Sequence, residues 1–279
     1  MLDAPAPPVP SRKPIARASR EGSDDGGCGK MAKDYVADTL SAPSLDHLFP
    51  NMGEFDKSVT SWPWLRREIG HAYRADKRNP IVGFINRDEA SILYSNARLF
   101  AGRAGIEVGA WRGWSTVHLI AAGISPLHVI EPLLGDPDWG SEFAATVALA
   151  GGADAAILVP ESSPDGVERL GASGVRWAFA FIDGDHDGEA PARDAAAVSR
   201  FLEPTAMVLF HDLVSPHVAS GLRVFEAQGW NVMAYQTAQM VGVAWRGQVA
   251  PVAHKPDPSQ TWNVPDHLRG IAISGVPAG

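Results

Sequence analysis

Apolar and polar residues alternate in blocks along most of this chain. From about Gly105 onward, five short apolar runs predict β-strands, and each leads into a longer segment with apolar residues at helical spacing. The predicted strands are GIEVGA, LHVIEP, AAILVP, WAFAFID and AMVLFHD. Because these strands are almost continuously apolar, both faces of their sheet should be covered, which is typical of a parallel sheet between helices.

Two more predicted strands follow the helical segment 215–229. They are WNVMAYQ and MVGVAWRG, and the short spacing between them leaves no room for a crossover helix. They should therefore pair as an antiparallel hairpin at the C-terminal edge of the sheet. The sequence thus predicts an α/β fold with a Rossmann-like, doubly wound, seven-stranded sheet that is mostly parallel.

The N-terminal part of the chain differs from the rest. Residues 1–34 are rich in Pro, Ala, Gly and charge, which predicts a disordered tail. Residues 35–104 are predicted to form a helical cap that packs over the strand ends and selects the substrate. Its helices are expected over residues 61–76, with Ser61 as N-cap, and from Asn86 to about Gly102. The sheet domain then spans residues 105–279.

Composition narrows the classes of protein that fit. The 279 residues are 45% hydrophobic and 20% charged, as in soluble globular proteins. No apolar run approaches the roughly 18 residues that a membrane-spanning helix needs. The net charge of −8 disfavours nucleic acid as a partner, and the single cysteine, Cys28, suits a reducing compartment. We therefore expect a cytoplasmic protein that binds neither nucleic acid nor membrane.

Polar residues follow each predicted strand, and ligands of parallel sheets bind at this end of the strands. The first strand leads into EVGAWRGWS, residues 107–115, in which Gly109 and Gly113 permit a tight turn before a helix N-terminus. The G-x-x-x-G spacing lacks the further glycine of a dinucleotide-binding loop. Taken alone, the turn is equally consistent with a plain strand–helix connection.

The second and third strands end in groups that could bind a nucleoside. Glu131 follows the second strand, where a carboxylate can accept hydrogen bonds from ribose hydroxyls. Ser162 and Ser163 follow the third strand. A solvated carboxylate at Glu131 and a helix N-cap at Ser163 are the alternatives.

The fourth and fifth strands both end in carboxylate and imidazole groups. Asp183, Asp185 and His186 follow the fourth strand, and His211 and Asp212 follow the fifth. Such groups are unfavourable together unless a cation, a proton or a ligand compensates them. Oxygen ligands with a histidine suit Mg²⁺ or Mn²⁺. The pattern predicts a functional site, although Asp185 and Asp187 could merely cap helices.

Together these motifs resemble the class I S-adenosylmethionine (SAM)-dependent methyltransferases. The nearest branch includes caffeoyl-CoA and catechol O-methyltransferases and the macrocin/cephalosporin-tailoring type enzymes. EVGAWRGWS, FIDGDHDGE and VLFHDL carry the resemblance, which covers roughly residues 86–247. It implies SAM as cofactor and O-methylation of a hydroxyl on a small natural-product, sugar or phenolic acceptor, as in secondary metabolism. Relatives of this type often form homo-oligomers through added N-terminal helices.

The resemblance also implies which residues contact SAM. Glu107 and the turn at 109–113 would contact the methionine part, Glu131 the ribose, and Ser162 or Ser163 the adenine. The full set of implied cofactor-binding residues is Glu107, Gly109, Ala110, Trp111, Gly113, Ser115, Glu131, Ser162, Ser163 and Asp183.

For catalysis, the resemblance implies a metal held by Asp183, His211 and Asp212. Mg²⁺ or Mn²⁺ at this position would lower the pKa of the acceptor hydroxyl. His211 replaces an oxygen ligand of the relatives, so a softer metal, or none, is the alternative. Without a metal, His186 or His211 would be the general base. The predicted catalytic residues are Asp183, His186 and His211.

Three other functions fit parts of the pattern. An NAD(P)-dependent oxidoreductase would share the sheet and the ribose carboxylate, but GAWRGW is not a G-x-G-x-x-G loop. A non-catalytic SAM-binding or scaffolding protein would not need the acidic strand ends. A metal-dependent hydrolase could use the Asp and His residues, but would not need the glycine turn and Glu131.

Overall fold

The structure is a computed structural model of the 279-residue chain. It describes residues 35–49, 52–54, 63–64, 74–76 and 85–274. The tail predicted over residues 1–34 lies outside these ranges.

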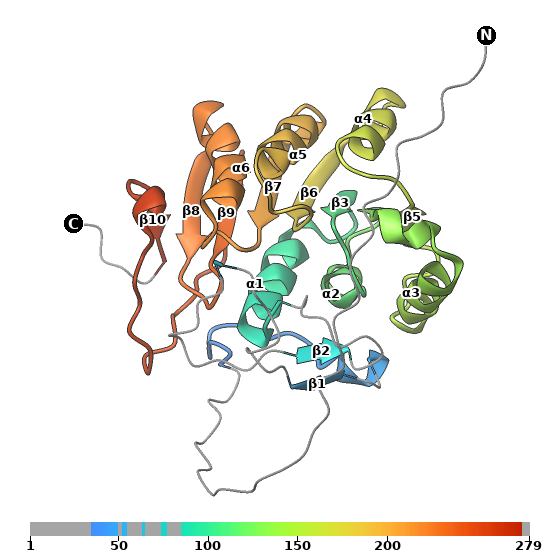
Figure 1. Ribbon diagram of the computed structural model, residues 1–279, viewed down its shortest axis with the longest axis horizontal. Helices are drawn as coiled ribbons and strands as arrows, with labels where there is room; N and C mark the ends of the chain where they lie inside the picture. The colour runs from blue at the N-terminus through green and yellow to red at the C-terminus, as the bar shows by residue number, and fades with distance from the viewer. Residues whose placement is uncertain (1–34, 50–51, 55–62, 65–73, 77–84, 275–279) are drawn as a thin grey trace, which may run out of the picture. The chain divides into compact units, whose positions relative to one another are not determined.

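An eight-stranded sheet lies at the centre of the fold (Figure 1), in the order β10-β8-β9-β7-β6-β3-β4-β5. Neighbouring strands are parallel except where β9 is involved, since β9 is antiparallel to both β7 and β8. The strands are β3 (Gly105–Val108), β4 (Leu127–Ile130), β5 (Ala156–Val159), β6 (Trp177–Ile182), β7 (Leu202–Phe210), β8 (Asn231–Tyr235), β9 (Val241–Arg246) and β10 (Ala272–Ile273).

The predicted fold class is confirmed, with one more strand than predicted. The five parallel strands and the antiparallel β8–β9 pair occur where the apolar runs predict them. The additional strand, β10, pairs with β8 in parallel and covers what would otherwise be the edge of the sheet. Two residues are too few to produce a periodic signal, so the sequence pattern could not show this strand.

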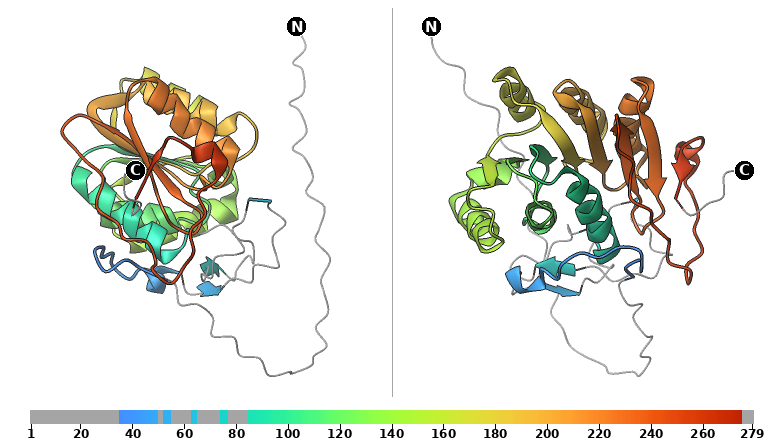
Figure 2. Two further views of the ribbon diagram at one scale, coloured as in Figure 1. Left: turned by 90° about the vertical axis from the view of Figure 1, so that its left-hand side faces the viewer. Right: turned by 180° about the vertical axis from the view of Figure 1, so that it is seen from behind.

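Helices cover both faces of the sheet (Figure 2). One face carries α1 (Arg87–Ala97), α2 (Trp114–Ala121) and α3 (Pro137–Leu149), and the other carries α4 (Asp165–Ala172), α5 (Ala190–Ser199) and α6 (Pro216–Ala227). Short 3₁₀ helices are Asp46–Leu48, Arg98–Phe100, Pro132–Gly135 and Asp266–Leu268.

Each face of the sheet has its own apolar core. In β6, which is buried throughout, Phe179 and Phe181 belong to the core under α1–α3, whereas Ala180 and Ile182 belong to the core under α4–α6. This alternation follows from the opposite directions of successive side chains in a strand. Burial on both faces also explains why these strands are apolar without interruption.

Of the two helices predicted for residues 35–104, the second occurs, as α1. Asn86 caps α1 by accepting from the Glu89 amide (2.9 Å), and the Glu89 carboxylate accepts in return from the Asn86 amide (3.1 Å). The helix predicted over 61–76 is wrong at its end, where Arg74–Asp76 forms strand β2, antiparallel to β1 (Met52–Glu54). A strand of three residues is defined by its pairing with a strand elsewhere in the chain. The hydrophobic periodicity of one segment does not reveal such a pairing. Residues 63–64 form a turn, and the remainder of that predicted helix lies outside the described residues.

Segments from both ends of the described chain hold α1 against the sheet. Asn96, which is fully buried, donates to the Tyr235 hydroxyl (3.1 Å) and accepts from the Val252 amide (3.0 Å). Asp88 accepts from the Ala37 amide (3.0 Å) and from His254 Nε2 (2.8 Å). The position of α1 therefore depends on residues more than 150 positions further along the chain.

No helix within the described ranges is both long enough and apolar enough to cross a membrane.

Candidate active site

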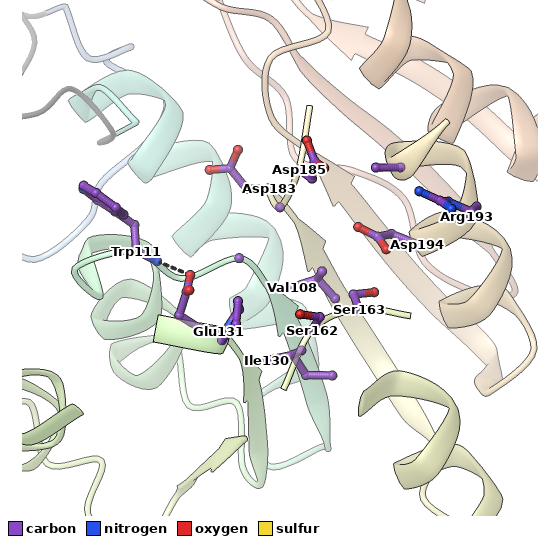
Figure 3. Close-up of a pocket in the computed structure, with 14 residues that line it drawn as sticks. Val108, Trp111, Ile130, Glu131, Ser162, Ser163, Asp183, Asp185, Arg193 and Asp194 are labelled. Atoms are coloured by element: carbon purple, nitrogen blue, oxygen red, sulfur yellow. Dashed lines mark hydrogen bonds between the residues drawn. The ribbon is translucent and has the colours of Figure 1, made fainter. Parts of the chain in front are cut away.

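A pocket of about 420 Å³ lies at the carboxyl ends of β3, β4 and β6 (Figure 3). This volume falls in the range that small-molecule sites usually have. The walls come from the segments that follow four parallel strands and from the first turn of α5. They are Val108, Gly109, Trp111, Ile130, Glu131, Pro132, Ser162, Ser163, Asp183, Gly184, Asp185, Ala190, Arg193 and Asp194.

Gly109 is required by a backbone contact between two strand ends. Its φ of 81° lies in the left-handed region, and a Cβ atom here would be 2.3 Å from the carbonyl oxygen of Asp183. It would also be 2.6 Å from Cα of Gly184. The sequence suggested that this glycine lets the backbone approach a ligand. The structure adds that β3 and β6 could not end side by side with a larger residue at this position.

Glu131 supports the turn that follows β3. Its Oε2 accepts from the amides of Ala110 (3.2 Å) and Trp111 (3.0 Å), and its Oε1 accepts from the Leu133 amide (3.0 Å). These bonds stabilise the left-handed backbone of Trp111, whose φ is 47°. A carboxylate offers about four acceptor positions, so Glu131 can still accept from a ligand in the pocket. Figure 3 shows the carboxylate between the pocket and the Trp111 backbone.

Trp111 is held in place by α3, a contribution that the sequence did not predict. Trp139 Nε1 donates to the Trp111 carbonyl (3.0 Å), and the centroids of the two rings are 4.7 Å apart. The Arg112 guanidinium lies 3.5 Å from the centroid of the Trp139 ring and pairs with Glu142 (3.0 Å). These contacts with α3 therefore fix the position of Trp111 in the pocket wall.

The predicted cofactor residues fall into two groups. Gly109, Trp111, Glu131, Ser162, Ser163 and Asp183 line the pocket. Four others are not among its wall residues, namely Glu107, Ala110, Gly113 and Ser115.

Glu107 is fully buried beneath the turn. Its two oxygens accept from the hydroxyls of Ser115 (2.5 Å) and Thr116 (2.6 Å), which ties the first turn of α2 to β3. Burial raises the pKa of Glu107 to about 8, against the lowering effect of these two hydrogen bonds. A pKa of about 8 favours the protonated form at neutral pH, in which the O–H of Glu107 donates to one of these hydroxyl oxygens and the other hydroxyl donates to Glu107. Glu107 thus acts as an internal anchor.

The ends of β6 and β7 bring four polar side chains together. His186 Nε2 lies 3.1 Å from Asp183 Oδ1 and 3.6 Å from Asp212 Oδ2. His211 Nδ1 lies 3.2 Å from Asp212 Oδ2 and 3.5 Å from Asp183 Oδ1. We call Asp183, His186, His211 and Asp212 the Asp/His cluster. Asp185 does not join it, because this exposed residue faces the pocket and accepts from the Asp187 amide (3.0 Å).

Two residues that the sequence did not single out complete this cluster. Glu89 of α1 accepts from His211 Nε2 (3.1 Å), and Gln239 Nε2 donates to Asp212 Oδ1 (3.0 Å). The spacing Asn86-x-x-Glu89 is that of a helix capping box, which hides the second role of Glu89. Gln239 lies in the connection between β8 and β9, where no sequence signal indicates a link to β7.

Protonated histidines compensate the carboxylates of the cluster. Burial opposes the charged form of His186, but its hydrogen bond to Asp183 and the charges of Asp212 and Asp183 raise its pKa to about 9. The charges of Asp212, Asp183 and Glu89 raise the pKa of His211 well above its usual value despite burial. Burial would raise the pKa of Asp212, but His211 holds it at about 2.

A divalent metal would find a partly different set of ligands from the one predicted. One ligand atom from each of Asp183, His186 and Asp212 lies within 4.8 Å of the others. His211, the predicted third ligand, instead directs both ring nitrogens at carboxylates. The donor types fit Mg²⁺ or Mn²⁺, provided that His186 gives up its proton to the solvent.

Comparison with known proteins gives a match to a family model and similarity to the folds of solved structures. Residues 106–213 match the model of a family described as a methyltransferase domain. The fold is similar to that of an O-methyltransferase from Bacillus cereus in complex with S-adenosylhomocysteine (SAH), with a TM-score of 0.51 and 14% identity over 60% of this chain and 84% of that chain. It is also similar to a candidate O-methyltransferase from Klebsiella pneumoniae, with a TM-score of 0.51 and 17% identity over 60% and 83% of the two chains. A search of curated proteins found no match.

We predict that Gly109→Ala destabilises the protein by more than about 2 kcal/mol, because the new methyl group would meet the backbone after β6 in addition to the unfavourable φ. Gly174→Ala is the matched control, since Gly174 also has a positive φ of 97° but open space around it. Denaturant unfolding of both variants measures the difference. Equal losses in the two variants would show that the contact with Asp183 is unimportant.

We predict that Glu107 makes stability fall as the pH rises. Between its unfolded value of 4.5 and its folded value of about 8, the folded protein binds one proton more than the unfolded chain. The free energy of unfolding should therefore decrease by about 1.4 kcal/mol per pH unit in this window, relative to Glu107→Gln, which cannot titrate. Unfolding of both proteins at pH 5, 6, 7 and 8 tests this. A constant difference between them would contradict the protonated state of Glu107.

Proposed function

We propose that the protein carries a class I SAM-dependent methyltransferase domain and transfers the methyl group of SAM to a hydroxyl of a small molecule. One observation supports this most directly. Asp183 lies both in the wall of the pocket and in the Asp/His cluster. A nucleoside in the pocket and a group that deprotonates an acceptor would therefore meet at one residue.

The pocket has the groups that a SAM molecule needs. Glu131 would accept from ribose hydroxyls, and Ser162 and Ser163 lie where the adenine would extend. The other charged wall residues are Asp183, Asp185 and Asp194 against one cation, Arg193. The net negative charge of these walls favours binding of the positively charged sulfonium of SAM and disfavours the negatively charged pyrophosphate of NAD(P). This weakens the oxidoreductase alternative.

SAM supplies an activated methyl group, so the protein has to orient the acceptor and remove its proton. His186 is the member of the cluster with the most accessible side chain, 27% exposed, and it is hydrogen bonded to Asp183. It is therefore the residue best placed to reach an acceptor. His211 has a side chain only 7% exposed and both nitrogens engaged, so a supporting role suits it better than that of the predicted base.

Two modes of deprotonation fit these positions. Asp183, His186 and Asp212 would hold a divalent metal, which supplies a Lewis acid that lowers the pKa of the acceptor hydroxyl. Alternatively, His186 takes the proton itself from its neutral form, whose fraction increases as the pH rises toward the His186 pKa of about 9. We favour small phenolic, sugar or natural-product acceptors, in the cytoplasm, with no nucleic acid or membrane as partner and with homo-oligomers as an option.

We predict that Glu131→Gln weakens the binding of SAM and SAH by about tenfold or more, since loss of one charged hydrogen bond has about this effect. Gln keeps an acceptor for the Trp111 amide, which Ala would not. Isothermal calorimetry of SAM, SAH and NAD⁺ makes the measurement, with Glu226→Gln on α6 as the control outside the pocket. Unchanged SAM affinity in folded Glu131→Gln, or a preference for NAD⁺, would contradict the proposed cofactor.

We predict that EDTA suppresses methyl transfer and that Mn²⁺ or Mg²⁺ restores it. Transfer from methyl-labelled SAM to a panel of catechols, simple phenols and glycosides measures the activity. Asp183→Asn should lose activity while it still binds SAH. Full activity in EDTA, combined with loss of activity in His186→Ala, would assign the proton to His186 without a metal.

A further inference from the structure

Glu89 accepts hydrogen bonds from three separate parts of the chain. Its Oε1 accepts from the Gln239 amide (2.8 Å), and its Oε2 accepts from the Asn86 amide (3.1 Å) and from His211 Nε2 (3.1 Å). The side chain is completely buried. Both oxygens of Glu89 thus have to be acceptors, a condition that only a carboxylate meets.

Gln239 connects Glu89 to Asp212, which follows His211 after the end of β7. Its amide binds Glu89, its side chain donates to Asp212 Oδ1 (3.0 Å), and its carbonyl accepts from the Val214 amide (3.3 Å). The backbone on both sides of this contact is left-handed, with φ of 62° at Asp212 and at Met240. Such conformations persist only where the surroundings fix them.

We propose that Glu89 and Gln239 are positioning residues of the methyl-transfer site, which fix His211 and Asp212 and thereby the places of Asp183 and His186. This inference rests on the proposed function. Neither residue lies within 106–213, the segment that matches the methyltransferase family, so that match does not assign them a role. The orientation of the cluster is thus imposed from α1 and from the β8–β9 connection.

The neighbouring residue Asp88 provides a chemically matched comparison. Asp88 is also buried, its oxygens accept from the Ala37 amide (3.0 Å) and from His254 Nε2 (2.8 Å), and it follows the same helix start. Asp88 binds the C-terminal segment, whereas Glu89 binds the cluster. Without the Asp88 contact, α1 is still attached through Asn96, which binds Tyr235 and the Val252 amide. An amide at either position would place an N–H group against an N–H donor, so both substitutions should lower stability by a similar amount. Only the substitution at Glu89 removes a contact with the Asp/His cluster.

The test compares Glu89→Gln and Gln239→Ala with Asp88→Asn in the full-length protein. Thermal unfolding measures stability, calorimetry with SAH measures the cofactor pocket, and turnover of a catechol such as 3,4-dihydroxybenzoate with SAM gives kcat and KM. NMR of ¹⁵N-histidine-labelled protein reports on the imidazoles of His186, His211 and His254.

We expect Glu89→Gln and Asp88→Asn to lose comparable stability and to bind SAH within about twofold of the parent protein. Glu89→Gln and Gln239→Ala should lower kcat at least about tenfold with a smaller change in KM, whereas Asp88→Asn should change kcat less than about twofold. In Glu89→Gln the signals of His211 and also of His186, which Glu89 does not contact, should shift. Asp88→Asn should shift only that of His254.

Unchanged His186 signals in Glu89→Gln, or an equal loss of kcat in Asp88→Asn, would overturn the positioning role. A different result marks failure of the proposed function itself, namely that the parent protein binds neither SAM nor SAH. If the parent binds SAH without methylating this catechol, the NMR comparison still decides whether Glu89 orients the cluster.

Discussion

The close contact between the backbones of Gly109 and Asp183 sets the geometry on which the rest of the site depends. It joins the ends of β3 and β6 so tightly that a Cβ atom has no room between them. Gly109, Asp183 and the turn that Glu131 supports line the pocket, and Asp183 also belongs to the Asp/His cluster. A shift of either strand end would change the pocket and the cluster together. Orientation of two reactants is the main task in methyl transfer, so a rigid junction at this point suits the chemistry.

The second constraint is the placement of three carboxylates around buried imidazoles. Asp183, Asp212 and Glu89 come from three different elements, and each would be unfavourable in this interior without a compensating charge. The two histidines provide that compensation, and it raises the pKa of both. The cluster is therefore a balanced set in which a change at one member alters the others.

Most of the sheet and part of the site could be predicted from the sequence because both follow from local patterns. Apolar runs indicate buried strands, and polar residues directly after them fall at the ligand edge, as Glu131, Asp183 and Asp212 do. The remainder depends on contacts between distant segments. Strand β10 is defined by its pairing with β8, Glu107 is removed from the pocket by hydroxyls of α2, and Glu89 reaches His211 across 122 positions. Such contacts leave no periodic trace in the sequence.

The attachment of α1 to the C-terminal segment has a consequence for how the site is made during synthesis. Helix α1, which carries Glu89, precedes the central sheet in the chain, whereas Val252 and His254, which hold it in place, follow β9. Because Gln239 follows β8, the sheet can form over β3–β7 before Asp212 has its partner Gln239. Folding units near the N-terminus generally form first as a chain emerges. In this protein Asp212 therefore lacks its hydrogen bond to Gln239 until the β8–β9 connection has been synthesised.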